Sequence, residues 1–151
     1  MKKNKTSIIV VTFNCEDVIK ENIVSCLQEN LAEIIIVDNA SKDGSVNRIK
    51  PFICDNLTLI KNKENKGYTY ACNQGIKIAK GHYIMLLNPD ARLEESTLNS
   101  LITRLDKNPT LGAVAPCLFY PDGSFQNYTR TFPTVMGLWV ENFVPKRFWN
   151  R

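Results

Sequence analysis

The chain has 151 residues, of which 44% are hydrophobic and 23% are charged, and its formal net charge is +4. This length suits one ordinary domain, and the composition excludes an intrinsically disordered chain and a fibrous repeat. The lysines lie among acidic residues except at the two ends, so the charge pattern is not that of a nucleic-acid-binding protein.

Apolar strands alternate with helices in the first third of the chain. Ser7 to Phe13 is rich in β-branched residues and predicts a strand, and Glu33 to Asp38 predicts a second one. A short helix is expected from about Ser45 until Pro51 disrupts it. Between the two strands, helical spacing is shown by Ile19, Ile23, Cys26 and Leu27.

The same alternation continues through the middle of the chain. A third strand is predicted from Leu57, and the third helix, in "YTYACNQGIKIAKG", is expected to end at Gly81. Tyr83 to Leu87 predicts a fourth strand. A fourth, amphipathic helix follows in "ESTLNSLITRLDKNP", with Ser96 as its N-cap. The expected inner face of the third helix consists of Ala71, Cys72, Gly75, Ile76 and Ala79.

Strands that are apolar at every position must be buried on both faces, so the alternation predicts a mostly parallel sheet flanked by helices. Ligands of such sheets bind at the carboxyl ends of the strands. A fifth strand in "GAVAPCLFYPDGSF" runs into the turn Pro121 to Gly123, which predicts a hairpin-like extension. The expected fold class is therefore α/β, as a single domain over residues 1–151.

The cysteines indicate where the protein resides. Five of them occur, with no Cys-x-x-Cys spacing, and an odd, dispersed set is typical of a reducing compartment. The early apolar run "IIVV" is shorter than a signal-peptide core, and no stretch approaches the ~20 apolar residues of a membrane span. We therefore expect a cytoplasmic protein whose membrane contact, if any, is peripheral and at the inner face.

Polar loops follow several of the predicted strands and should share one edge of the sheet. Asp38 ends its strand, where a carboxylate can accept a hydrogen bond from a base N–H or a ribose hydroxyl. An ordinary N-capping loop, with Asp43 or Ser45 as the cap, explains this segment equally well. Gly67 can bring the backbone close to a phosphate or sugar, although a loop glycine with positive φ is the simpler explanation.

The loop after the fourth strand, "NPDAR", has the pattern of a metal-binding bend. Pro89 fixes φ and turns the chain away from the sheet, which leaves Asn88 and Asp90 on either side of the bend. Amide and carboxylate oxygens suit Mg²⁺ or Mn²⁺, and Mg²⁺ takes only one or two protein carboxylates when phosphate and water complete its shell. A structural turn with a solvated Asp90 is the alternative. Arg92 can add positive charge near a phosphate or be a solvated surface residue.

The segments "VVTFN", "IIIVDNASKDGS", "NKGYTYACNQGIKIAKG" and "IMLLNPDARL" resemble, in this order and spacing, the family 2 glycosyltransferases of the GT-A fold. They look most like the rhamnosyltransferase-type enzymes of bacterial surface polysaccharide assembly. The resemblance covers about Ser7 to Pro133. It implies a Rossmann-like GT-A domain that transfers a sugar, with inversion, from a nucleotide diphosphate donor such as a UDP- or dTDP-sugar. The acceptor would be a hydroxyl of a saccharide or a lipid-linked saccharide.

The same resemblance implies the roles of individual residues. A bound Mg²⁺ or Mn²⁺ would be held by Asp90, with Asn88 standing where the first aspartate of a D-x-D motif often lies. Thr12 and Asn14 would border the base pocket, and Asp38 would contact the nucleoside. The rest of the donor site would be lined by Lys66, Gly67 and Asn73.

The general base of the family is expected downstream, in a segment that contains Glu-Asp, and no match precedes the last residue of the chain. We therefore expect the acceptor region to be missing, and we assign the role of base to neither Asp122 nor Glu141. A catalytically incomplete nucleotide-sugar-binding module that needs a partner chain is the alternative function. An unrelated doubly wound signalling domain is disfavoured because no acidic cluster follows the first strand.

The last residues of the chain combine aromatic and basic side chains. They can rest on a membrane surface near a lipid-linked acceptor, or belong to the core of the acceptor region. These residues are Trp139, Phe143, Lys146, Arg147, Phe148, Trp149 and Arg151.

Overall fold

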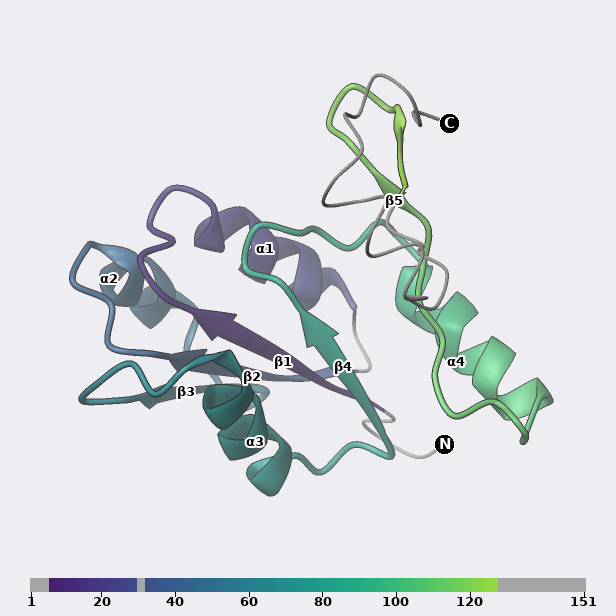
Figure 1. The fold of residues 1–151 in the computed structure, drawn as a ribbon, viewed down its shortest axis with the longest axis horizontal. Helices are drawn as coiled ribbons and strands as arrows, with labels where there is room; N and C mark the ends of the chain where they lie inside the picture. The colour runs from purple at the N-terminus through teal and green to yellow at the C-terminus, as the bar shows by residue number, and fades with distance from the viewer. Residues whose placement is uncertain (1–5, 30–31, 128–151) are drawn as a thin grey trace, which may run out of the picture. The chain divides into compact units, whose positions relative to one another are not determined.

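The computed structural model describes residues 6–29 and 32–127. Its core is a 4-stranded parallel sheet in the order β3-β2-β1-β4, which confirms the predicted α/β fold (Figure 1). The strands are β1 (Thr6–Thr12), β2 (Ala32–Asp38), β3 (Leu57–Lys61) and β4 (Tyr83–Leu87). The helices are α1 (Ile19–Gln28), α2 (Ser45–Ile49), α3 (Tyr68–Ile78) and α4 (Thr97–Lys107), with a 3-10 segment η1 (Lys50–Phe52) after α2.

Strand β1 lies at the centre of the sheet and is buried over its whole length. It pairs with β2 from Thr6 opposite Ala32 to Thr12 opposite Asp38, and with β4 on its other side. Its β-branched residues suit this position because they pack well on a pleated surface that is covered on both faces. The parallel register places the carboxyl ends of all these strands at one edge.

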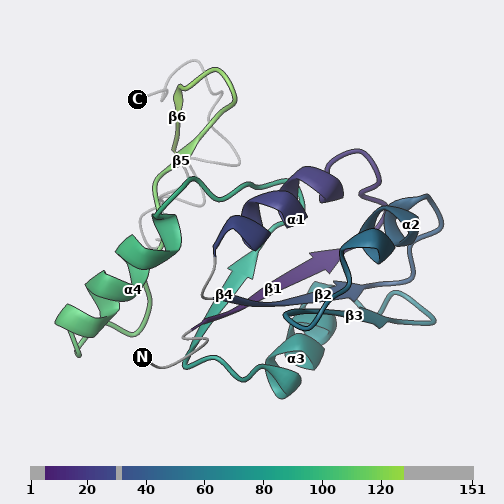
Figure 2. The same cartoon turned by 180° about the vertical axis from the view of Figure 1, so that it is seen from behind.

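Two apolar clusters cover the two faces of the sheet. Alternate residues of β1 and β2 point to opposite sides, so Ile8 belongs to one cluster and Ile9 to the other. Helices α1 and α2 cover the first face and α3 covers the second, as both views show (Figure 2). The α3 side of the core consists of Ile9, Val11, Ile35, Val37, Ala71 and Cys72.

The prediction that β4 is buried on both faces is wrong. Ile84 and Leu86 are 41% and 50% exposed, whereas Leu87 is buried. The reason is that β4 is the last strand of the sheet among the described residues, while α3 packs against β1 and β2 on that face. On α3, which covers this face of the sheet, Ile76 was expected to point inward, but it is 42% exposed.

Local signals predicted some helix ends and not others. As expected, α2 gives way at Pro51, where the chain continues as η1. Gly81 does not end α3, which stops at Ile78 with Ala79 already in extended conformation. Ser96 occupies the N-cap position of α4, but with a left-handed φ of 66° and without a side-chain capping hydrogen bond.

The chain forms two compact units, Met1–Val114 and Ala115–Arg151. The described part of the second unit contains the predicted hairpin, formed by β5 (Leu118–Phe119) and β6 (Phe125–Gln126). The N–H of Gly123, at φ +80°, donates to the carbonyl of Tyr120 at 2.9 Å and closes the turn. The single domain over residues 1–151 stays a prediction.

The C-terminal aromatic and basic residues, and Glu141 among the candidate acids, lie outside the described residues. Within residues 6–29 and 32–127, none of the helices has the length and apolar character needed to cross a membrane.

Replacing Gly81 with alanine is expected to destabilise the fold. An added Cβ would lie 2.4 Å from the backbone nitrogen of Ser7 and 2.5 Å from the carbonyl carbon of Thr6. Because these atoms belong to the central strand, the variant should lose about 1–3 kcal/mol of unfolding free energy, the usual cost of overpacking. Urea unfolding measures the loss. Gly112→Ala is the matched control, since its Cβ meets nothing within 4 Å; equal losses in both variants would contradict the steric explanation.

Candidate functional site

The carboxyl edge of the sheet carries the loops that follow β1, β2, β3 and β4. Parallel pairing brings them to this edge although they are far apart in the chain. The predicted donor-binding and metal-binding residues lie on these loops, at the ends of the strands, or on α3.

Hydrogen bonds join the loops after β1 and β2. The N–H of Asn14 donates to Ser41 Oγ at 3.0 Å, and Asn14 Oδ1 accepts the N–H of Lys42 at 2.9 Å. The N–H of Cys15 donates to Ser45 Oγ at 2.8 Å. Asn14 itself has a φ of 54°. Its side-chain oxygen is therefore used by the fold, which leaves the amide N–H groups to meet a ligand.

Asp43 organises the start of α2. Its Oδ1 accepts both the N–H and the hydroxyl of Ser45, at 3.0 and 2.5 Å, and its Oδ2 accepts the N–H of Glu16 at 3.1 Å. The hydrogen bond from the Ser45 hydroxyl is the main reason that the pKa of Asp43 is lowered. The N-cap position itself is Gly44. The expected cap at Asp43 or Ser45 is therefore wrong, although Asp43 still orders the loop ahead of α2 through its hydrogen bonds.

Asp38 and Thr12 face each other across the ends of β2 and β1 and are both buried. Asp38 Oδ2 accepts the N–H of Ser41 at 3.1 Å. Among the described residues, Asp38 Oδ1 and Thr12 Oγ1 have no hydrogen-bond partner. Buried polar atoms normally have partners, so this pair marks a place for a water molecule or a ligand atom. Asp38 is only 2% exposed, so its carboxylate is shielded from a ligand in this structure.

Side-chain amides hold the loop after β3. Buried Asn39 donates to Asn65 Oδ1 at 2.7 Å and to the carbonyl of Gly67 at 3.2 Å, and its Oδ1 accepts from Asn62 at 3.1 Å. Asn62 and Gln74 exchange two further hydrogen bonds, at 2.7 and 2.9 Å. This network was not predicted from the sequence. Its signal was the recurrence of Asn and Gln directly after β2, after β3 and inside α3.

Gly67 is the N-cap residue of α3 and has a φ of 90°. A Cβ at this position would meet nothing within 4 Å, so the glycine is required by its backbone conformation rather than by close packing. Lys66 is exposed and pairs with Glu64 at 3.0 Å, a hydrogen bond that raises the pKa of Lys66. Asn73 is exposed on α3.

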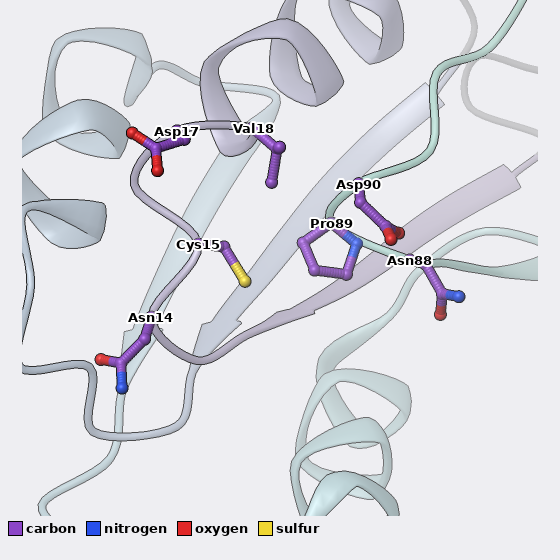
Figure 3. A pocket seen from close by; sticks show the side chains of 7 residues that line it. All are labelled: Asn14, Cys15, Asp17, Val18, Asn88, Pro89 and Asp90. Atoms are coloured by element: carbon purple, nitrogen blue, oxygen red, sulfur yellow. The ribbon is translucent and has the colours of Figure 1, made fainter. Parts of the chain in front are cut away.

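A pocket of about 430 Å³ lies between the loop after β1 and the bend after β4 (Figure 3). Cys15 and Val18 point toward the ring of Pro89, whereas Asn14 and Asp17 point away from it. The lining residues are Asn14, Cys15, Asp17, Val18, Asn88, Pro89 and Asp90. The pocket therefore brings Asn14 together with both predicted metal ligands. It is not lined by Thr12, Asp38, Lys66, Gly67 or Asn73.

Two side chains of α1 contact the loop after β4. Neither was predicted from the sequence to take part in the site. Asn22 donates to the carbonyls of Asn88 and Ala91, at 2.9 and 2.8 Å. Arg92 forms an ion pair with Glu21, also on α1, and both side chains are more than half exposed. The charge of Arg92 is thus partly neutralised on the protein surface.

Asn88 and Asp90 supply too few ligands to bind a cation alone, so they fit a cation only when a phosphate supplies further oxygen ligands. Asn88 and Asp90 are both exposed and offer hard oxygen ligands, as Mg²⁺ and Mn²⁺ prefer. Across residues 6–29 and 32–127, no group of three or more His, Cys, Asp and Glu side chains could hold a metal ion. The chemistry of this pair suits an ion whose other ligands are water and phosphate oxygens.

Comparison with known proteins matches the chain to one family of glycosyltransferases. The family model described as "Glycosyl transferase family 2" matches residues 7–150. Over 86 residues the chain is 38% identical to the Escherichia coli "UDP-Glc:alpha-D-GlcNAc-diphosphoundecaprenol beta-1,3-glucosyltransferase WfaP". This match covers 56% of this chain and 34% of that protein. It is 30% identical over 111 residues to the "Poly-beta-1,6-N-acetyl-D-glucosamine synthase" of Staphylococcus aureus, covering 72% of this chain and 27% of the synthase.

The fold agrees with these matches. The crystal structure of S. aureus TarS 1-349 superposes with a TM-score of 0.59 at 25% identity, over 68% of this chain and 32% of that one. The GT-A-like architecture expected from the sequence is thereby confirmed. The chain spans 34% of WfaP and 27% of the synthase, well under two thirds of either relative.

Replacing Thr12 with valine removes Oγ1 and keeps the shape of the side chain. Because this buried hydroxyl has no partner among the described residues, the unfolding free energy should stay within about 0.5 kcal/mol of the wild type or rise. Ser45→Ala is the contrasting variant, since its hydroxyl bonds both Cys15 and Asp43, and it should lose about 1–3 kcal/mol. Urea unfolding of both variants is the measurement, and a loss above about 1 kcal/mol in Thr12→Val contradicts the assignment of an orphaned hydroxyl.

Proposed function

Because the chain belongs to glycosyl transferase family 2, we propose that it binds a nucleotide diphosphate sugar at the carboxyl edge of its sheet and transfers the sugar, with inversion, to an acceptor hydroxyl. The observation that carries the proposal is the pocket that is lined both by Asn14 and by the bend of Asn88 and Asp90. An exposed carboxylate on a rigid turn, beside a loop that ends the central strand, suits a diphosphate that arrives with its cation.

The donor is proposed to be a UDP- or dTDP-sugar. The name of WfaP specifies a UDP-sugar donor, and the resemblance of the motifs to rhamnosyltransferase-type enzymes adds dTDP-sugars. The nucleoside would lie toward Asp38, whose unpartnered oxygen can accept a hydrogen bond, and toward Thr12, whose hydroxyl can accept or donate one. The Asn39 network would hold Gly67 and Lys66 along the same edge, and Asn73 is retained as a donor-site residue on α3.

The chemistry requires the diphosphate to leave. Negative charge grows on its oxygens as the glycosidic bond breaks, and a bound Mg²⁺ or Mn²⁺ supplies neutralising positive charge there. Asp90 and Asn88 would hold that ion. Pro89 keeps the pair on a fixed backbone, so little conformational entropy is lost when the ion and donor bind.

The acceptor is proposed to be a saccharide or lipid-linked saccharide of a bacterial surface polymer. WfaP and the poly-N-acetylglucosamine synthase support this class by their names. A lipid-linked acceptor would place the reaction in the cytoplasm at the inner face of the membrane, with peripheral contact only.

The general base is left unassigned. The carboxylate of Asp122 accepts the N–H and the hydroxyl of Ser124 inside the hairpin turn, at 2.9 and 2.6 Å, and the bond from the hydroxyl is the main reason that the pKa of Asp122 is lowered. A donor-binding module completed by a partner chain is the alternative function. Donor binding without hydrolysis or transfer to a broad panel of acceptors would select this alternative.

Calorimetric titration with UDP, dTDP and GDP, in Mn²⁺ and in EDTA, tests the donor proposal. We expect Mn²⁺-dependent binding of at least one nucleotide. Asp90→Ala should weaken it by about tenfold or more, as expected for the loss of one charge-assisted ligand. Asp55→Ala, an exposed carboxylate before the amino end of β3, is the matched control and should bind normally. Absence of binding to all the nucleotides would overturn the proposal, and normal binding by Asp90→Ala would remove the role given to Asp90.

Cysteine alkylation locates the binding site independently. Cys15 lines the pocket and is half-buried, whereas Cys54 is exposed before β3 and serves as the internal control. Burial raises the pKa of Cys26 to about 12, so this thiol should stay unmodified in the native protein. UDP with Mn²⁺ is expected to slow iodoacetamide modification of Cys15 several-fold and leave Cys54 unchanged, as read by peptide mass spectrometry. Equal rates at Cys15 with and without bound nucleotide would place the site elsewhere.

A further inference from the structure

We propose that Asn22 is a positioning residue that fixes the bend of Asn88 to Ala91 for the cation and diphosphate; the inference rests on the function proposed above. Asn22 lies on the inner face of α1 between Ile19 and Ile23, and it is 1% exposed. An amide buried among apolar residues is costly unless its hydrogen bonds are made, and in Asn22 both hydrogens of Nδ2 have partners whereas Oδ1 has none among the described residues. Its position therefore depends on what it binds.

The side chain of Asn22 binds main-chain atoms on both sides of the Pro89-Asp90 pair. Nδ2 donates one hydrogen to the carbonyl of Asn88, at 2.9 Å, and the other to the carbonyl of Ala91, at 2.8 Å. The N–H of Ala91 also donates to the carbonyl of Asn88, at 3.1 Å. These bonds fix the orientation of the peptide planes before and after the bend. Among neutral side chains, only a primary amide supplies two donors from one nitrogen.

Ser25, one turn further along α1, holds the exit of the same loop. Its Oγ accepts the N–H of buried Leu93 at 3.1 Å and donates to the carbonyl of Asn22 at 2.8 Å. Together Asn22 and Ser25 bind three main-chain groups between residues 88 and 93. We call these contacts of Asn22 and Ser25 the α1 clamp.

The α1 clamp fixes the backbone and leaves the ligand side chains free. Asn88 and Asp90 remain exposed at the pocket, while the Pro89 ring faces Cys15 and Val18 (Figure 3). A ligand pair on a pre-ordered backbone loses less conformational freedom on binding than a pair on a mobile loop. Without the clamp, part of the binding free energy would be spent in ordering residues 88–93. The affinity that depends on the cation should therefore fall.

The α1 clamp can be tested with Asn22→Leu, which removes both donors and keeps a side chain of similar size. Asn47→Leu, at an exposed position of α2, is the matched control. In the ligand-free protein, we expect the amide hydrogens of Ala91 and Leu93 to exchange about tenfold faster in Asn22→Leu, whereas those of β2 keep their protection. Hydrogen exchange followed by NMR reads these sites individually.

Calorimetry then separates a positioning role from a purely structural one. In Asn22→Leu, the Kd for the nucleotide found to bind the wild type should rise about tenfold in Mn²⁺, the equivalent of one or two lost hydrogen bonds, and stay unchanged in EDTA. A merely structural anchor would reduce stability and leave both Kd values unchanged in the folded protein. Should Asn22→Leu fail to fold, Ser25→Ala removes the acceptor of the Leu93 N–H and the donor to the Asn22 carbonyl but keeps both Asn22 donors, and a roughly threefold change in the same direction is expected.

The outcomes distinguish the two proposals. If the wild type binds no nucleotide diphosphate, the proposed function fails and this inference fails with it. If the wild type binds but Asn22→Leu and Ser25→Ala bind equally well in Mn²⁺, only the positioning role is overturned, whatever the exchange rates show. Faster exchange at Ala91 and Leu93 together with weaker Mn²⁺-dependent binding supports the proposal.

Discussion

The parallel pairing of β1 with both β2 and β4 is the constraint on which the rest of this structure depends. It buries every residue of β1 and separates the core into two clusters, one under α1 and α2 and the other under α3. The same pairing brings Thr12, Asp38 and Asn88 to one edge of the sheet. Core and candidate site are thus two results of one hydrogen-bonding pattern, and a shift of register would alter both.

Neutral amides order the loops after β3 and β4. Asn22 holds the bend after β4, and Asn39 and Asn62 hold the loop after β3. An amide offers both donors and acceptors and costs less to bury than a carboxylate, so it can fix a loop from inside the core. The two carboxylates predicted to contact the donor and its cation differ in setting: Asp90 is exposed, whereas Asp38 is buried with one oxygen unpartnered among the described residues.

The sequence predicted what local chemistry determines. The β-branched runs indicated the strands, Pro51 ended α2, and the Pro-Asp-Gly turn indicated the hairpin closed by Gly123. The sequence did not predict the features that depend on which segments pack together in the fold. Ile84 looks like a buried strand residue, and only the order of strands makes β4 an edge. Asn22 occupies a position that in sequence resembles an ordinary polar residue of a helix, because its partners lie 66 and 69 residues away.

The α1 clamp also bears on how such a site can change over evolutionary time. Asn22 binds the carbonyl oxygens of residues 88 and 91, and Ser25 binds the N–H of residue 93. Main-chain groups of this kind are common to nearly all amino acids, so substitutions at 88 and 90 leave the anchor intact. A lineage can therefore exchange asparagine for aspartate at these positions without having to rebuild the turn that carries them.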